Sequence, residues 1–198
     1  MNAITLCDPE AYSFDAETHT YRNATGREVD SVTTIIGLHW PINRSFYKSA
    51  NTNRGTDMHE LTASLERGDI QIVDVPPKYK QAAAAWMEFV KTARWKPIAI
   101  EEKFVTAQYA GTIDRIYETS KGLLLCDMKT GAPAKWHEIQ LAAYSHAVEQ
   151  LTGTSIDFHA VAHLDMDACR VRLKTHDPIE RAKMCWDGLM TWRSFRGK

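Results

Sequence analysis

Acidic side chains end two neighbouring apolar segments in the middle of the chain. Residues 123–126 form an apolar run that leads directly into Asp127, Met128 and Lys129, and Asp114 occupies a similar place in the preceding segment. Because successive side chains alternate across a strand, Asp127 and Lys129 should point to the same face. If the two segments pair across a turn near residues 120–122, the carboxylates of Asp114 and Asp127 can approach each other.

Two adjacent carboxylates repel each other, and burial raises the cost of their charges. A hard divalent cation relieves both problems, and magnesium typically takes one or two carboxylates together with water and phosphate oxygens. A lysine beside such an ion can position or deprotonate a water molecule, or stabilise charge on a phosphorane-like transition state. The combination indicates metal-assisted hydrolysis of a phosphodiester. The alternative is that Asp127 and Lys129 form a solvated strand end near a turn.

The segments around these residues predict the elements that must position them. Three successive strands with tight connections are expected at residues 96–105, 109–119 and 122–130, followed by a helix at 134–153 that ends at Gly153. Two more strands at 156–165 and 169–176 precede a closing helix, with Asp177 as its cap and Pro178 at its first position. This order predicts an α/β fold with a mixed central sheet flanked by helices.

The N-terminal part of the chain has a different character. Short strands and turns are expected in residues 11–36, where Ser31 could cap a helix. Residues 41–67 are expected to be helical in two pieces, and residues 76–95 form a strong helix that begins with Pro76 and Pro77. We therefore expect a single domain over residues 1–198, in which residues 1–95 supply a hairpin and helices and residues 96–198 supply the α/β core.

Composition limits the class of protein. The chain has 198 residues, a net charge of −1 and four scattered cysteines without a CxxC pair. A globally basic nucleic-acid coat is excluded, so contact with phosphates must come from local patches or metal ions. No apolar run approaches the roughly 20 residues that span a bilayer, and the N-terminus lacks the features of a secretory signal. A cytoplasmic protein without membrane partners is expected.

Four ordered motifs resemble those of a known family. They are "RGTDMHE" in the upstream helix, "GTID" as G-x-x-D, "DMKTG" as D-x-K-T-G, and "QLAAY" as Q-x-x-x-Y. In this order they resemble the RecB-type branch of the PD-(D/E)XK nucleases, over roughly residues 97–151 and the upstream helix. The resemblance implies a restriction-endonuclease-like core. The proline of the nominal signature is absent before Asp114, as is usual in this branch.

The resemblance implies roles for particular residues. Asp114 and Asp127 would be metal ligands, and the backbone carbonyl of Met128 would add a third. Lys129 would be the catalytic lysine, and His59 would be a further metal ligand from the upstream helix. The ion would be Mg²⁺ or Mn²⁺. The alternative for His59 is a helix histidine that packs without a catalytic role.

Gln140 and Tyr144 would support the site and the DNA backbone. They lie four residues apart and therefore share one face of the expected helix, although ordinary hydrogen bonding between helix and sheet would also account for them. An acid in the strand before Asp114 is a further supporting residue. Glu101 and Glu102 have opposite facings, and we favour Glu102 because two isoleucines, at positions 98 and 100, share its face.

Cations and aromatic residues alternate in the segment "NRSFYKSANTNR" at residues 43–54. Arg44, Lys48 and Arg54 accompany two aromatic residues there, and the segment contains no acid. Such a mixture suits nucleic-acid strands, where bases stack and phosphates pair with cations. The alternative is a solvated helix with two buried aromatic residues.

Together these features predict a metal-dependent deoxyribonuclease. A stand-alone RecB-like protein suggests a phage or prophage exonuclease in DNA recombination, repair or replication, with a possible protein partner from those processes. The cysteine spacing makes an iron–sulfur cluster unexpected, and no Walker A motif indicates a helicase motor. Two alternatives remain: a structure-specific endonuclease with the same site, and a non-catalytic nucleic-acid-binding protein that retains the fold.

Overall fold

A mixed five-stranded sheet forms the centre of the molecule. The computed structural model describes residues 4–7, 12–18, 20–40 and 49–197, apart from the side chains of residues 49–53. The central strands are β4 (Lys96–Val105), β5 (Ala110–Thr119), β6 (Gly122–Lys129), β7 (Phe158–Asp165) and β8 (Arg170–Thr175). They lie in the order in which they occur in the sequence, and β6–β7 is a parallel pair within an otherwise antiparallel sheet. The predicted mixed α/β architecture is confirmed.

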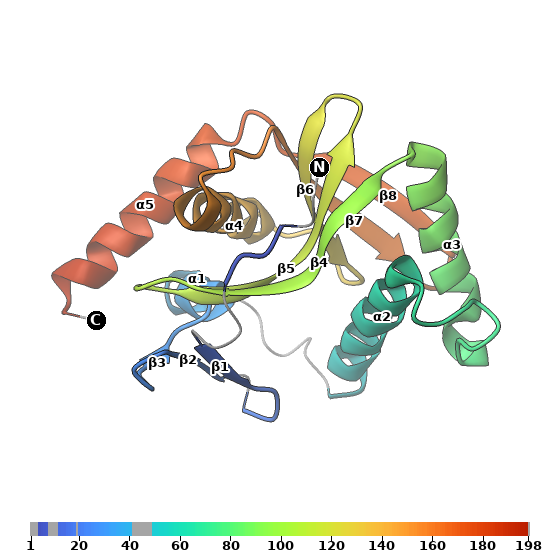
Figure 1. The fold of residues 1–198 in the computed structure, drawn as a ribbon, viewed down its shortest axis with the longest axis horizontal. Coiled ribbons are helices and arrows are strands. Elements are labelled where there is room, and N and C mark those ends of the chain that lie inside the picture. The colour runs from blue at the N-terminus through green and yellow to red at the C-terminus, as the bar shows by residue number, and fades with distance from the viewer. Residues whose placement is uncertain (1–3, 8–11, 19, 41–48, 198) are drawn as a thin grey trace.

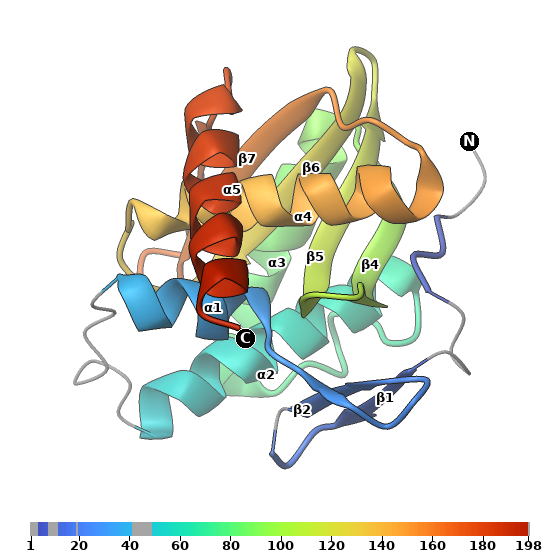
Figure 2. The same ribbon diagram turned by 90° about the vertical axis from the view of Figure 1, so that its left-hand side faces the viewer.

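Helices cover both faces of this sheet (Figure 1). The helices are α1 (Val32–His39), α2 (Ser49–Arg67), α3 (Pro77–Ala93), α4 (Trp136–Thr152) and α5 (Glu180–Phe195). Helices α4 and α5 lie on one face and α2 and α3 on the other, as the turned view in Figure 2 also shows. A small separate sheet contains β1 (Tyr12–Asp15), β2 (Thr20–Asn23) and β3 (Glu28–Val29).

Burial on both faces explains the apolar run of β6. Leu123 and Leu125 belong to the core cluster on the α4 side, whereas Leu124 and Cys126 belong to the cluster on the α2–α3 side. A strand that is covered on both faces is apolar at successive positions rather than at alternate ones. The parallel partner β7 is reached through α4, because a parallel connection needs a long crossover.

Local signals at the helix ends were mostly sufficient to place them. Ser31 caps α1 by accepting a hydrogen bond from the Thr34 amide, as predicted. The predicted start of the last helix is wrong, since α5 begins at Glu180. The carboxylate of Asp177 instead accepts a hydrogen bond from the backbone amide of His159 and lies 2.9 Å from its ring Nδ1. This long-range contact takes the side chain that would have capped the helix.

A buried ion pair joins α2 to the sheet. The Arg115 side chain is fully buried, and its guanidinium lies 2.7 Å from Glu66 on α2 and 2.9 Å from Glu101 on β4. Glu66 also accepts hydrogen bonds from Tyr117 on β5 and from Trp86 on α3. A buried charge of this kind is tolerated because its hydrogen-bonding groups are satisfied. The position of α2 over the sheet therefore depends on Arg115.

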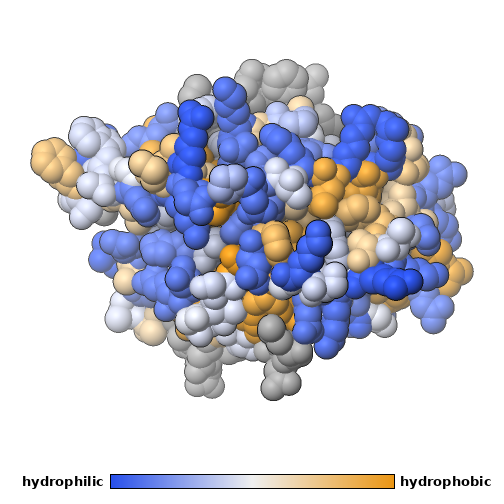
Figure 3. All heavy atoms as spheres, turned by 90° about the horizontal axis from the view of Figure 1, so that it is seen from above, coloured by the Kyte–Doolittle hydropathy of each residue, from blue (hydrophilic) through white to orange (hydrophobic). Residues whose placement is uncertain are grey.

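Hydrophobic side chains are mostly internal. The view in Figure 3 shows hydrophilic residues over most of one face, with hydrophobic ones in separate groups. Within the described ranges, none of the helices combines the length and the apolar character that crossing a membrane requires.

The ion pair of Arg115 generates the first prediction. Glu66→Gln should lower the free energy of unfolding by about 3 kcal/mol, because removing one partner leaves a buried guanidinium without its full counter-charge. Urea denaturation monitored by tryptophan fluorescence measures the change.

Arg67→Ala provides the matched control, because Arg67 is the next residue of α2 and forms an exposed pair with Asp69. Exposed pairs contribute little, so the unfolding midpoint of Arg67→Ala should stay close to that of the wild type. Equal destabilisation by the two variants would contradict the role given to Glu66.

Candidate metal centre

The candidate site lies where β5 and β6 stop pairing. The described register ends with Arg115 opposite Cys126, and one further step would set Asp114 opposite Asp127. Instead, the Asp114 carboxylate accepts a hydrogen bond of 2.8 Å from the Met128 amide. A hydrogen bond to a side chain thus replaces a backbone hydrogen bond between β5 and β6 at this point. The two aspartates lie beside the gap where these strands separate.

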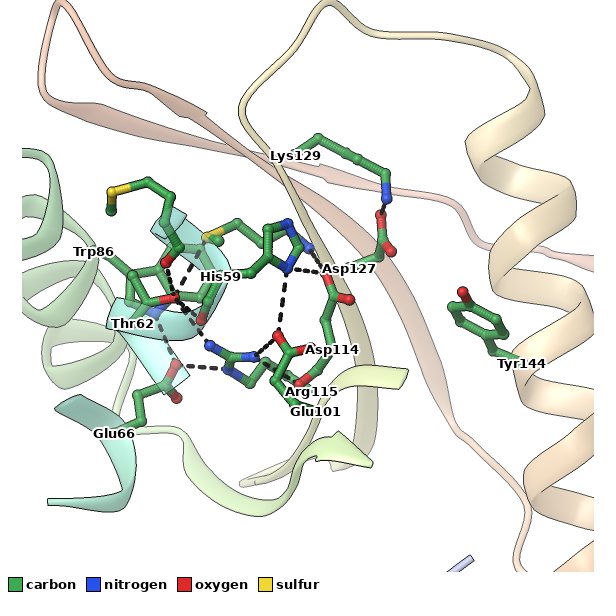
Figure 4. A network of polar contacts seen from close by, with 12 residues as sticks. His59, Thr62, Glu66, Trp86, Glu101, Asp114, Arg115, Asp127, Lys129 and Tyr144 are labelled. Carbon is green, nitrogen blue, oxygen red and sulfur yellow. Dashed lines mark hydrogen bonds and ion pairs between the residues drawn. The ribbon is translucent and has the colours of Figure 1, made fainter. Parts of the chain in front are cut away.

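His59 reaches this gap from α2 (Figure 4). Its Nδ1 lies 3.3 Å from Asp114 Oδ2 and 3.4 Å from Glu101 Oε1. Helix α2 comes close to the end of β6 at Gly55, where a Cβ atom would lie 3.2 Å from Thr130 Oγ1. His59, Glu101 and Asp114 each contribute one potential ligand atom, and these three atoms lie within 4.8 Å of one another. The close approach of α2 therefore assembles a three-residue cluster.

Glu101, and not Glu102, faces the cluster, so the preference for Glu102 is wrong. Ile100 pairs with Arg115 and Glu102 pairs with Ile113, which sets Glu101 level with Asp114. Glu101 has a φ of 51°, in the left-handed region, which breaks the regular alternation on which the facing argument relied. Glu102 Oε1 instead accepts a hydrogen bond from the amide of residue 6.

Asp127 and Lys129 lie on the adjoining strand and contact each other. Lys129 Nζ is 2.6 Å from Asp127 Oδ2, as expected for side chains that share a strand face. Asp127 is 1% exposed, its Oδ2 is occupied by this ion pair, and its Oδ1 has no partner among the described residues. Its oxygens lie outside the 4.8 Å cluster of His59, Glu101 and Asp114. Asp127 is therefore a buried carboxylate whose Oδ1 still has capacity to bind.

The charges of the site shift the pKa values of its members. Burial, together with the charges of Asp127 and Glu101, raises the pKa of Asp114 to about 7, although His59 opposes this rise. Burial alone would lower the pKa of His59, but Asp114 and Glu101 raise it above its ordinary value. Burial alone would raise the pKa of Glu101, but His59 and Arg115 hold it below its ordinary value. Protons thus compensate part of the negative charge of the cluster.

These residues fit a divalent cation. Two carboxylates and one imidazole of the cluster supply oxygen and nitrogen donors, and the adjoining Asp127 adds an Oδ1 that has no partner among the described residues. Binding would require a neutral imidazole and ionised carboxylates, so it would displace the protons that the cluster holds. An imidazole in the donor set favours manganese over magnesium, which prefers oxygen ligands.

Tyr144 on α4 lies beside Asp127 (Figure 4), and Gln140 is one helical turn away from Tyr144. Gln140 Nε2 donates a hydrogen bond of 2.8 Å to the Tyr144 hydroxyl, and both residues are buried. Burial, with a contribution from the charge of Asp127, raises the pKa of Tyr144. A Cβ atom at Gly111 would lie 3.0 Å from the rings of Phe104 and Tyr144, so the glycine of the GTID motif makes room for this packing.

The predicted basic segment is described only in part. Arg44 and Lys48 lie outside the described residues. Arg54 Nη2 lies 2.7 Å from Asp167 in the turn between β7 and β8, and both side chains are exposed. Arg54 is therefore paired with an acid.

Sequence reasoning did not identify Arg115 and Glu66 as partners. A signal was available, because Glu66 continues the helical spacing of Met58 and Thr62 on α2, and Arg115 directly precedes the apolar residues Ile116 and Tyr117 of β5. Opposite charges at positions expected to be buried indicate a buried pair. The spacing of residues along the sequence does not show which acid pairs with Arg115.

Comparison with known proteins agrees with this geometry. A family model described as "PD-(D/E)XK nuclease superfamily" matches residues 71–184, which is more than half of the chain. The matched segment contains Glu101, Asp114, Asp127 and Lys129 but ends short of His59 on the N-terminal side. A search of curated proteins finds no match.

The orientation of the two neighbouring glutamates generates a prediction. Glu101→Gln should weaken Mn²⁺ binding by about tenfold or more, because it removes one negative charge from the cluster. Glu102→Gln removes the same charge one residue away and keeps an acceptor for residue 6, so it should bind Mn²⁺ like the wild type. Isothermal titration calorimetry compares the two variants, and equal losses would contradict the assignment of Glu101.

A second prediction concerns the imidazole of His59. The wild-type protein should bind Mn²⁺ more tightly than Mg²⁺, and His59→Ala should reduce this preference because the remaining donors are oxygens. Calorimetry with each ion measures the ratio of the two dissociation constants. His146→Ala, on α4 beside Tyr109, is a control that should leave the ratio unchanged. An unaltered Mn²⁺ affinity in His59→Ala would show that His59 is a packed histidine without a ligand role.

Proposed function

Because this chain belongs to the PD-(D/E)XK nuclease superfamily, we propose that it hydrolyses DNA phosphodiester bonds at the site formed by Asp114, Asp127 and Lys129. The superfamily implies a metal-dependent nuclease. Glu101 and His59 complete the proposed metal site, and the Met128 carbonyl is a further proposed ligand.

The observation that carries the proposal is the pairing of Asp127 with Lys129. A buried carboxylate lies 2.6 Å from a lysine amine, keeps one oxygen without a partner among the described residues, and adjoins a cluster of acids and a histidine. A solvated strand end would not bury Asp127 to 1% exposure. The alternative of a simple surface ion pair is therefore disfavoured.

The side chains have separate tasks in this proposal. When bound, a divalent cation would polarise the phosphate and lower the pKa of water. Asp114, Asp127 and Glu101 fix the position of positive charge at the strand ends, and Arg115 holds Glu101 in place. The Lys129 amine acts on the attacking water or on the charge that develops on the phosphate oxygens. Gln140 and Tyr144 support Asp127 from α4.

Within the superfamily we propose the RecB-like branch and an exonuclease that uses Mg²⁺ or Mn²⁺. Two features support the branch: His59 on a helix before the strands, and the Gln140–Tyr144 hydrogen bond on the helix that follows the lysine. The corresponding biological role is that of a phage or prophage exonuclease in the bacterial cytoplasm. It would act in recombination, repair or replication with a protein partner of those processes. A structure-specific endonuclease with the same site, and a non-catalytic binding protein, are the competing proposals.

Digestion of labelled DNA tests the proposal directly. Linear and circular substrates, single-stranded and double-stranded, are incubated with Mg²⁺, Mn²⁺ or a chelator. An exonuclease should degrade the linear forms and spare the circles, whereas an endonuclease should cut both. Absence of cleavage of every substrate with both ions would reject nuclease activity and favour the binding protein.

The role of Lys129 generates a prediction. Lys129→Ala should reduce the rate of cleavage by about 100-fold or more, because it removes a charge that acts in the transition state. Mn²⁺ affinity should stay near the wild-type value, because the lysine is not a ligand. Lys121→Ala removes the same charge in the turn before β6 and should cleave normally. Cleavage by Lys129→Ala at the wild-type rate would reject the catalytic role.

A further inference from the structure

A second row of polar side chains crosses the sheet next to the acidic one. The parallel register of β6 and β7 places Lys129 beside His163, and the antiparallel register of β7 and β8 places His163 opposite Arg172. Residues that are paired across neighbouring strands lie side by side and share a face of the sheet. Lys129, His163 and Arg172 therefore form one continuous row, which we call the basic row.

The basic row lies on the α4 face, two residues beyond Asp127 along β6. Val161 shares this face of β7 and packs in the α4-side core, whereas Ala162 and Leu164 pack in the cluster on the other side. Burial decreases along the row from β6 to β8. The side chain of Lys129 is 20% exposed, His163 is half-buried, and Arg172 is exposed. Since β8 is an edge strand, the row runs from the candidate metal centre to the open edge of the sheet.

The two outer members of the row have capacity to bind a ligand. Arg172 makes no hydrogen bond or ion pair with any residue that the structure describes. His163 Nδ1 lies 3.4 Å from the Gly131 carbonyl oxygen, which can only accept a hydrogen bond, so this contact places the proton on Nδ1 and makes Nε2 an acceptor in the neutral ring. Burial lowers the pKa of His163, so the ring is mainly neutral at pH 7.

The charge of Arg172 acts on Asp165, whose carboxylate is bonded mainly to backbone amides. Asp165 is paired in register with Arg170, and its Oδ1 accepts hydrogen bonds from the amides of Asp167 and Ala168. It therefore holds the turn between β7 and β8. In the adjoining row, Lys174 lies 3.7 Å from Glu138. Arg172 is thus the exposed cation that the row presents at the sheet edge.

We propose that Arg172 binds a phosphate of one DNA strand and leads that strand past the His163 ring to Lys129 and the metal centre. The inference rests on the proposed nuclease function. Two strand spacings of about 4.8 Å separate Lys129 from Arg172, so one nucleic-acid strand can contact both side chains. The phosphates would approach over the basic row because the acidic row of Glu101, Asp114 and Asp127 repels them until a cation is bound.

The test measures DNA binding and cleavage by Arg172→Ala and His163→Ala. Fluorescence anisotropy with a labelled oligonucleotide, as single strand and as duplex, is recorded in chelator over a series of salt concentrations. Arg172→Ala should weaken binding about tenfold and reduce the slope of log affinity against log salt by about 0.7 to 0.9, because one phosphate contact is lost. His163→Ala should weaken binding by less and leave the slope unchanged, because the neutral ring contacts the strand without carrying a charge. With Mg²⁺, both variants should raise KM more than they lower kcat.

Arg181→Ala is the matched control. Arg181 is an exposed arginine in the first turn of α5, close in sequence to Asp177, which contacts the opposite end of β7 from His163. Arg181→Ala changes the net charge of the protein by the same amount as Arg172→Ala. It should leave the DNA affinity, the slope of log affinity against log salt and KM unchanged.

The outcomes separate the two proposals. If the wild-type protein fails to cleave but Arg172→Ala still loses affinity relative to Arg181→Ala, the nuclease function fails and the basic row stands as a binding site. If the wild-type protein cleaves DNA and both row variants behave like Arg181→Ala, the basic row is rejected and the nuclease function stands. Absence of DNA binding by the wild-type protein at low salt also rejects the basic row.

Discussion

The buried guanidinium of Arg115 is the interaction on which the arrangement of the site depends. Its donors reach Glu66 on α2, Glu101 on β4, the Thr62 hydroxyl on α2 and the carbonyl oxygen of Asp114. A charge in a dry interior is costly unless it is paired and hydrogen-bonded, so these partners are fixed relative to one another. The same partners thereby hold helix α2, which carries His59, and the Glu101 carboxylate close to Asp114.

The site concentrates negative charge along one line across the sheet. Glu101, Asp114 and Asp127 come from three neighbouring strands, and His59 and Lys129 supply the nearby positive charge. The raised pKa of Asp114, about 7, follows from burial beside two other acids. Such a line of carboxylates is unfavourable by itself and becomes favourable with a bound cation. The same repulsion that strains the ion-free protein provides its affinity for metal.

The period of a β-strand separates this acidic line from the basic row. Residues two apart on a strand share a face, so the D-x-K spacing sets Asp127 in the acidic line and Lys129 in the next line along the strand. The registers of β7 and β8 extend the second line through His163 to Arg172. In the proposed site, the spacing of one motif would therefore set both the position of a metal ion and the direction from which a phosphate backbone approaches it.

The sequence by itself determined the central strands, their flanking helices and the acid–lysine constellation. The apolar runs and turn residues at 96–129 are local signals, and Asp127 and Lys129 are close because they belong to one strand. Only the tertiary structure decided the facing of Glu101 and the partner of Arg115. It also moved the start of α5 to Glu180, since Asp177 contacts His159. Local periodicity specifies which face a regular strand residue occupies, but a left-handed residue breaks that rule, and charged partners are chosen by packing between segments far apart in the chain.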